Sequence, residues 1–207
     1  FHMSKQVLLM PCPPNTRGVY SLASITGSMP FTLAETDILY AFQWTTPDHY
    51  AVLDYLSVSV VVSSAITTAI VTGIELVPVR DFFNAYTGGV DRLGVAPDIH
   101  EMKLKSNFPT SLAADIRVAN TIPLELPLVP GTEDGVGIAN AIFGTGTAVG
   151  TTILADQPLF DRAANSYPFI MDKFEGFVVR MALNGPATGN LRFGIDHRWL
   201  EVTKATF

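Results

Sequence analysis

Charge is scarce in this 207-residue chain, because only 15% of its residues are Asp, Glu, Lys or Arg, against about 25% in an ordinary soluble domain. The 13 basic and 19 acidic residues give a formal net charge of −6. A protein that holds nucleic-acid phosphates needs a clustered cationic surface, so we expect no nucleic-acid partner. Hydrophobic residues make up 48% of the chain, which argues against disorder and predicts a surface short of charge.

Cysteine is nearly absent, since Cys12 is the single one and no intrachain disulfide is possible. Prolines surround it, and none of them can stabilise a thiolate, so an indifferent or buried thiol is the simpler interpretation. A chain of this length buries roughly 70% of its unfolded surface and needs no disulfide or metal to form a core. The length itself predicts one domain, with at most an added arm.

The first 17 residues are expected to lie outside that domain. Phe1-His2-Met3 resembles a vector scar ahead of a start at Met3 or Ser4, and no signal peptide follows. Residues 4–15 carry an apolar run and then three prolines in four positions, which predicts an extended arm. Its candidate interface residues are Val7, Leu8, Leu9, Met10, Pro11, Pro13 and Pro14. The arm either covers a neighbouring subunit or folds back as an edge strand, and the domain proper is 18–207.

Two uncharged stretches, Tyr55–Ile74 and Gly135–Ala155, reach the length of a membrane span. The first interleaves Ser and Thr with Val, and the second is rich in Gly, so both are typical of strands or loops. We therefore expect no membrane partner.

A period of two dominates from Phe31 onward. In 52–62, Leu56, Val58 and Val60 fall on one face and Ser57 and Ser59 on the other. The predicted strands are Ile38–Trp44, Val52–Val62, Ile66–Leu76, Met102–Leu104, Ala114–Thr121, Pro168–Met171, Phe177–Leu183 and Leu191–Val202. The last two are expected to form a hairpin, and Thr151–Leu154 also has the composition of a strand.

Helices are poorly supported, the best candidates being the short segments Pro109–Ala114 and Pro158–Asn165. Many strands without alternating helices predict an all-β fold, an antiparallel β-sandwich or jelly roll with an extended N-terminal arm. Pro130–Gly150 is rich in glycine and is predicted to be a long loop of functional, mobile or interface character.

Candidate catalytic groups are few. Asp196 and His197 are adjacent in a strand, so they point to opposite faces and cannot form an acid/base dyad. His197 is expected in the core or an interface, and His49 in a solvated turn. The nearest carboxylate pairs are Asp172 with Glu175 and Asp196 with Glu201, which prove little alone.

Sequence motifs for nucleophiles, zinc and calcium are missing. Gly144-Thr145-Gly146 resembles a phosphate loop but lacks the third glycine, the Lys-Ser/Thr ending and a following helix. We therefore expect no enzyme activity, no metal and no cofactor. Trp44 and Trp199 lie in apolar strands, which favours core packing over a sugar-stacking platform, although a carbohydrate-binding module stays an alternative.

Five segments together resemble a family of small proteins encoded among the structural genes of tailed bacteriophages and prophages. They are Leu39–Trp44, Asp115–Thr121, Glu175–Arg180, Ala187–Leu191 and Arg198–Val202. The resemblance implies a virion component, head-associated or decorating a capsid, without known catalytic residues.

A subunit of this kind would be assembled in the host cytoplasm and would contact copies of itself, with a trimer plausible, and a major capsid or other virion protein. The charge-poor composition agrees, because interface cores are depleted in charge. The alternative is a receptor- or carbohydrate-binding jelly-roll module of a tail or cell surface.

Overall fold

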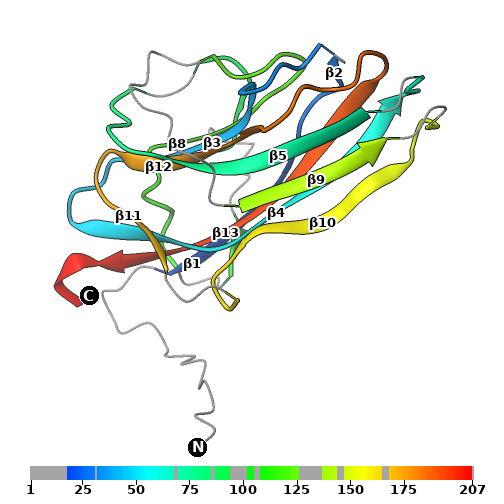
Figure 1. The fold of residues 1–207 in the computed structure, drawn as a ribbon. Coiled ribbons are helices and arrows are strands. Elements are labelled where there is room, and N and C mark those ends of the chain that lie inside the picture. The colour runs from blue at the N-terminus through cyan, green and yellow to red at the C-terminus, as the bar shows by residue number, and fades with distance from the viewer. Residues whose placement is uncertain are drawn as a thin grey trace, which may run out of the picture.

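A computed structural model describes residues 18–30, 32–67, 70–84, 87–93, 102–104, 108–125, 137–143, 147–164 and 168–206. They form two antiparallel sheets that pack face to face (Figure 1). The predicted β-sandwich is therefore confirmed, and its jelly-roll connectivity stays a prediction. Apart from a 3-10 turn at Lys204–Thr206, these residues contain no helix.

The first sheet has seven strands, with the order β10-β4-β13-β1-β7 along its main path. Two further strands attach to it, β11 to β4 and β2 to β13. Its strands are β1 (Val19–Ile25), β2 (Met29–Pro30), β4 (His49–Ser64), β7 (Met102–Lys103), β10 (Thr152–Asp161), β11 (Phe169–Met171) and β13 (Asn190–Thr203).

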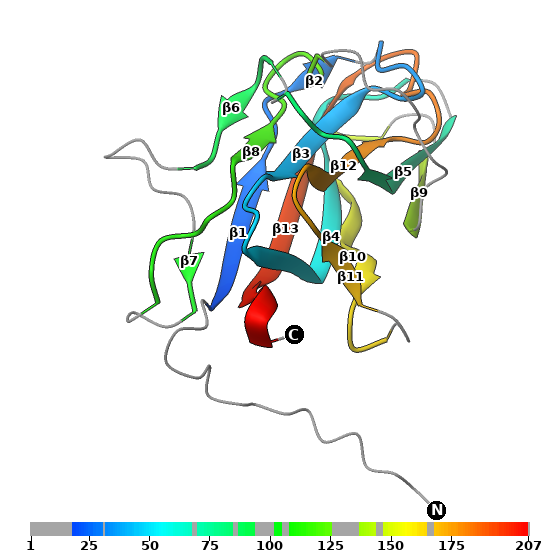
Figure 2. The ribbon, with the colours of Figure 1, turned by 90° about the vertical axis from the view of Figure 1, so that its left-hand side faces the viewer.

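The second sheet has six strands in the order β6-β8-β3-β12-β5-β9. Its strands are β3 (Ile38–Trp44), β5 (Ile70–Val79), β6 (Val90–Asp91), β8 (Asp115–Val118), β9 (Gly137–Phe143) and β12 (Glu175–Met181). Figure 2 looks along the sandwich and places β6 and β7 at one lateral edge and β9 and β10 at the other.

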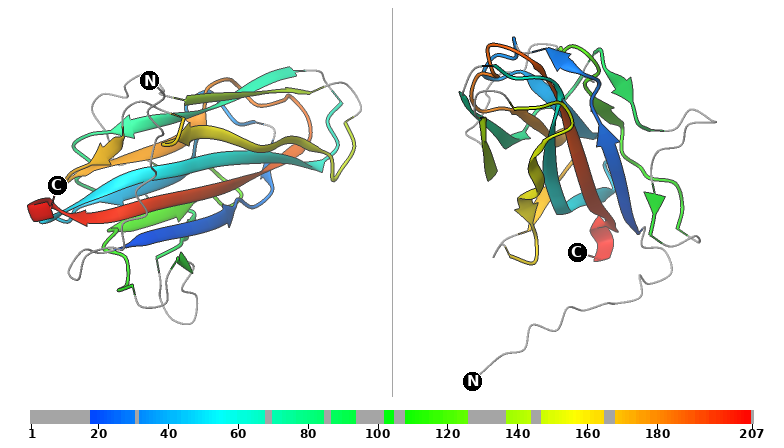
Figure 3. Two further views of the ribbon diagram at one scale, coloured as in Figure 1. Left: turned by 90° about the horizontal axis from the view of Figure 1, so that it is seen from below. Right: turned by 90° about the vertical axis from the view of Figure 1, so that its right-hand side faces the viewer.

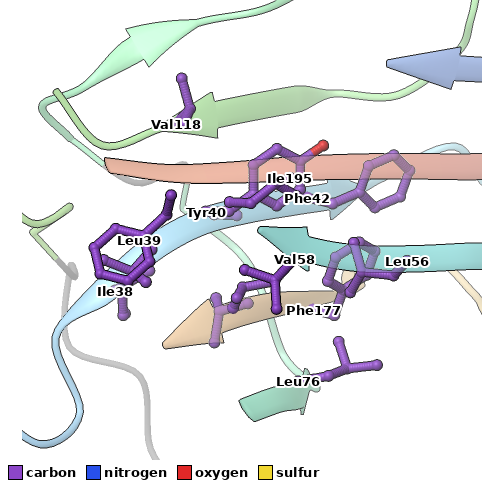
Figure 4. Close-up of a cluster of buried hydrophobic side chains, with 14 of the residues drawn as sticks. Ile38, Leu39, Tyr40, Phe42, Leu56, Val58, Leu76, Val118, Phe177 and Ile195 are labelled. Carbon is purple, nitrogen blue, oxygen red and sulfur yellow. The ribbon is translucent and has the colours of Figure 1, made fainter. Parts of the chain in front are cut away.

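The core lies between the sheets and follows the period of two. Along β13 every second residue from Leu191 to Glu201 is buried, and the residues between them are exposed or half-buried. Aromatic side chains from both sheets meet there, because the Phe42 ring of β3 lies 5.7 Å from that of Trp199 on β13. Within the second sheet, the Phe42 ring lies 5.4 Å from that of Phe177 on the neighbouring strand β12 (Figure 4). The strand β3 is buried along its whole length, so it forms the centre of the second sheet.

The predicted hairpin between Phe177–Leu183 and Leu191–Val202 is wrong. The strands β12 and β13 lie in different sheets, and their inward faces meet across the core, where the Phe177 and His197 rings are 5.0 Å apart. Alternation of apolar residues shows which side chains face inward. It does not show whether two such strands are hydrogen-bonded neighbours or belong to facing sheets.

Both helical candidates are also wrong. Residues 109–114 form no helix or strand, and 158–161 belong to β10, where Pro158 pairs with Ser57. Proline is tolerated there because β10 is the outermost strand of its sheet, where a missing N–H need not interrupt a ladder.

Strand positions were predicted with mixed success. The bounds of β3 are those predicted, and Val52–Val62 falls within β4, whereas β5 begins at Ile70 and not at Ile66. The glycine-rich segment 130–150 is not simply a loop, because 137–143 forms β9 in regular register with β5. The sequence pattern missed β1, which precedes Phe31.

Candidate functional site

The arm proposed as the interface, Val7 to Pro14, lies outside the described residues, as does His100. Of the glycine-rich segment, 137–143 and 147–150 are described, and Thr147 bridges to Ile66. The described features that bear on function are therefore the buried polar groups, the outer faces of the sheets and their edges.

His197 is a fully buried core residue, as expected, and packs against aromatic rings. The ring centroids of Phe42 and Trp199 lie 4.9 and 4.7 Å from it. Its Nδ1 shares a 3.0 Å hydrogen bond with the Tyr40 hydroxyl, and its Nε2 has no partner among the described residues. Burial lowers the pKa of His197 to about 3. The imidazole is therefore neutral at physiological pH and supports packing.

His49 differs from expectation in being half-buried. It begins β4, and its backbone carbonyl accepts a hydrogen bond from Trp44 Nε1 at 3.0 Å. Trp44 and Trp199 are both fully buried, which confirms their assignment to the core.

The two candidate carboxylate pairs have structural partners. Glu175 accepts a hydrogen bond from the Asp172 backbone N–H at 2.8 Å, and Asp172 accepts one from Lys204. Burial acts to raise the pKa of Asp172, but hydrogen bonds from Lys204 and the Lys173 N–H outweigh it and lower that pKa. Asp196 and Glu201 lie on opposite faces of β13, because Asp196 is exposed and Glu201 is buried.

Glu201 holds the segment 109–113 against the sheet. Its Oε1 accepts hydrogen bonds from Ser111 Oγ at 2.5 Å, from the Leu112 N–H at 2.9 Å and from Trp199 Nε1 at 3.3 Å. A buried carboxylate needs such donors. The sequence pattern did not indicate this group. It explains why 109–114 is not helical, because the Leu112 N–H donates to the side chain of Glu201, far away in the sequence.

A second polar group lies on the outer face of the first sheet, around a bulge in β10. Asp156 has a positive φ of 45° and accepts hydrogen bonds from Ser57 Oγ at 2.5 Å and from Tyr55 Oη at 3.2 Å. Asp196 pairs in register with Ser57. Burial raises the pKa of Asp196, Arg198 opposes this and Asp156 adds to it.

These contacts fasten the bulge to β4, since the Asp156 N–H also donates to Ser59 Oγ at 2.9 Å. Ser57 and Asp156 do not form a proton relay with a histidine. His197, on the neighbouring strand, faces the core, on the other side of the sheet. Among the described residues, no three His, Cys, Asp or Glu side chains are grouped to hold a metal ion.

The edge formed by β9 and β10 is long and differs between its two strands. β9 and β10 lie side by side in two directions of view (Figure 3). β10 is interrupted by three register shifts against β4 and contains Pro158, features that discourage further strand pairing. β9 has seven residues, no charged residue, no proline and no register shift against β5.

The free side of β9 has no strand partner among the described residues. One exposed apolar side chain lies beside it, because Val71 pairs in register with Ile142 and is 50% exposed. An uncharged regular edge with an apolar neighbour is suited to pairing with another strand.

One exposed aromatic pair stands apart from this edge. Phe83 is 60% exposed, and its ring lies 4.9 Å from that of Phe174. Lys173 Nζ is 4.6 Å from the Phe174 centroid. Phe174 has a φ of +64°, an uncommon conformation for a bulky residue.

The fold and these surfaces define a β-sandwich with one open, uncharged strand edge. No family model, curated protein or solved structure matches the chain. No helix among the described residues is long and apolar enough to cross a membrane.

Proposed function

We propose that this chain is a non-enzymatic structural subunit of a bacteriophage virion, a capsid decoration or head-associated protein that acts by assembling with other protein. The observation that carries the proposal is the β9 edge, seven residues without charge, proline or bulge beside exposed Val71. Such an edge is an aggregation hazard unless another strand covers it, so its natural state is within an assembly.

The composition and the sequence resemblance support the same proposal. A surface with few charges is typical of one that other protein covers. The buried polar groups His197 and Glu201 support packing and the fixing of one segment, and they offer no arrangement for a reaction. Partners are then copies of this chain, in a closed ring such as a trimer, and a major capsid or other virion protein.

Light scattering of the purified chain tests the proposal over a range of concentrations. We expect an oligomer, and we expect deletion of residues 1–17 to weaken it while circular dichroism shows the β fold unchanged. A monomer at every concentration would contradict an assembling subunit. Labelling the protein in images of intact particles would then place it in a virion.

A receptor- or carbohydrate-binding module is the second candidate, and the exposed Phe83/Phe174 pair favours it. Aromatic faces stack on the apolar faces of ligands, and a nearby cation adds recognition of anionic groups. A glycan array should then show hits that Phe83→Ala removes and that the exposed control Val149→Ala leaves unchanged. An array without hits removes this candidate.

A further inference from the structure

We propose that the β9 edge receives the N-terminal arm of a second copy of this chain, which adds residues 4–10 as a further strand of the six-stranded sheet. This inference rests on the assembly function proposed above and names the partner of its open edge. The reasons are the length of the edge, the composition of the arm and the distance between them in one molecule.

The two segments match in length and character. Ser4–Met10 has seven residues ahead of Pro11, and β9 has seven residues, Gly137–Phe143. The arm stretch contains Val7, Leu8, Leu9 and Met10, whose side chains are suited to the apolar surroundings of Val71. Strand addition gains affinity from main-chain hydrogen bonds and specificity from alternate side chains. Pro11 lacks an N–H, so it ends the pairing where β9 ends.

The geometry of the sandwich separates the arm from the β9 edge of its own molecule. The described chain starts at Gly18, whose carbonyl accepts a hydrogen bond from the Glu201 N–H, four residues from His197 on β13. Phe177 packs on His197, and Gly137 is level with Val179, two residues beyond Phe177 in the other direction. At about 3.3 Å per residue these six residues separate Gly18 from the nearer end of β9 by about 20 Å along the strands.

A sideways separation adds to this distance. From β1 to β10 there are three strand spacings, or about 14 Å, and β9 lies in the facing sheet about 10 Å away. The straight line is therefore about 26 Å and passes through the core. Met10 and Gly18 are eight residue spacings apart and are separated by at most about 29 Å when the chain is fully extended. This is only slightly more than the straight line through the core, so it is too short for a route around the surface. A neighbouring molecule has no such restriction.

Mixed disulfide trapping tests the inference directly. In a Cys12→Ser background, one chain carries Val7→Cys or Leu8→Cys and a second, distinguishable by a size tag, carries Ile138→Cys, Asn140→Cys or Ile142→Cys. The acceptor control is Gln157→Cys, an exposed position on the neighbouring strand β10. After mixing under mild oxidation, we expect covalent adducts of the two chain types, at least about tenfold more with the best β9 position than with the control.

Each other outcome overturns the inference. Equal adducts at Gln157 would mean unspecific collision. A chain carrying both an arm and a β9 cysteine that closes on itself at high dilution would mean that the arm pairs within one molecule. Adducts between two Asn140→Cys chains that exceed the arm adducts would mean that β9 pairs with β9 of the neighbour.

Light scattering separates failure of the inference from failure of the proposed function. If wild-type protein is oligomeric and no arm adduct forms, the chain assembles through another contact. If wild-type protein is a monomer at all concentrations, the assembly function itself fails.

Discussion

Each lateral edge of this sandwich consists of one outermost strand from each sheet, but the two edges differ in the length of these strands. At one edge the outermost strands, β6 and β7, have two residues each. At the other edge β9 and β10 have seven and ten residues. A short edge strand offers few unpaired backbone groups, whereas a long one offers a row of them. The first edge therefore leaves little backbone for another strand to pair with, and the second is the one that the proposed assembly would use.

Loop packing closes the edge at β6. Thr87 forms a β-bridge with Glu125, and the Arg92 side chain donates to the Ile25 carbonyl of the other sheet at 3.5 Å. A Cβ on Gly89 would lie 2.4 Å from the Val118 carbonyl oxygen. Among the described residues, no hydrogen-bonded strand lies on the outer side of β9, and β10 of the other sheet lies beside it. Four predictions test this contrast, ordered by their expected effect on the free energy of unfolding.

The largest effect concerns the core that both edges share. Because the folded pKa of His197 is about 3 and the ordinary pKa of histidine is 6.5, protonation favours the unfolded state between these pH values. The contribution of His197 to the free energy of unfolding should be complete above pH 6.5. It should fall by about 1.4 kcal/mol per pH unit as the pH drops toward 3. Urea unfolding at several pH values measures this slope.

The double variant Tyr40→Phe/His197→Leu removes both partners of the buried hydrogen bond. Its free energy of unfolding should therefore lack the pH dependence that His197 causes. Tyr40→Phe alone keeps the imidazole and should keep this pH dependence. Asp196 and Asp115, whose pKa values burial raises, act in the opposite direction, because their folded forms bind protons more readily. The comparison of variants cancels these carboxylates, and equal slopes would contradict the assignment to His197.

The next effect tests the closed edge. Gly88 and Gly89 both have positive φ, but an added Cβ meets open space at Gly88 and the Val118 carbonyl at Gly89. Gly88→Ala should cost about 1 kcal/mol from backbone strain alone, and Gly89→Ala about 2–3 kcal/mol from strain and overpacking. Thermal or urea unfolding measures both, and equal losses would show that the β6 edge is loosely packed.

An ion pair between β12 and β5, next to β9, should contribute a similar or smaller amount to the free energy of unfolding. Arg180 Nε and Glu75 Oε1 are 2.5 Å apart, and both side chains are largely buried on the outer face of β12 and β5. Arg180→Met should cost about 2 kcal/mol because it leaves the carboxylate without its partner. The double variant Arg180→Met/Glu75→Leu should recover part of this loss, and no recovery would mean that the pair is not coupled.

The smallest effect on stability is expected at the open edge itself. Asn140→Lys places a charge on β9 and should change the free energy of unfolding by less than about 0.5 kcal/mol. It should weaken self-association at least about tenfold, because charged edge strands resist pairing. Val90→Lys on β6 is the matched control and should alter neither property. Sedimentation velocity measures the association, and equal effects of both variants would remove the contrast between the edges.

Sequence patterns located most strands because their residues keep a period of two. The strand Ile38–Trp44 was predicted with its exact bounds, since a β-branched or aromatic residue occupies every second position of it. The strand β9 was hidden by the glycines on both sides of Ile138–Phe143, which are typical of a loop. Propensity describes single residues, and the ladder with β5 outweighs it.

Contacts distant in the sequence account for the other differences. The segment 109–114 lost its predicted helix because Ser111 and Leu112 donate to Glu201, about ninety residues away. Asp156 gained a role at a bulge because β10 lies beside Ser57 and Ser59. No local pattern shows such partners, so neither polar group could be recognised beforehand.

The sequence by itself determined the class of this protein, because alternating apolar residues, scarce charge and frequent Gly and Pro leave sheets packed on sheets as the way to bury the chain. It also determined that His197 faces inward and Asp196 outward, since this follows from the geometry of one strand. Only the tertiary structure decided which strands became neighbours and which edge was left open. Strand order depends on pairing between residues far apart in the chain, and every inward-facing strand satisfies the same alternation.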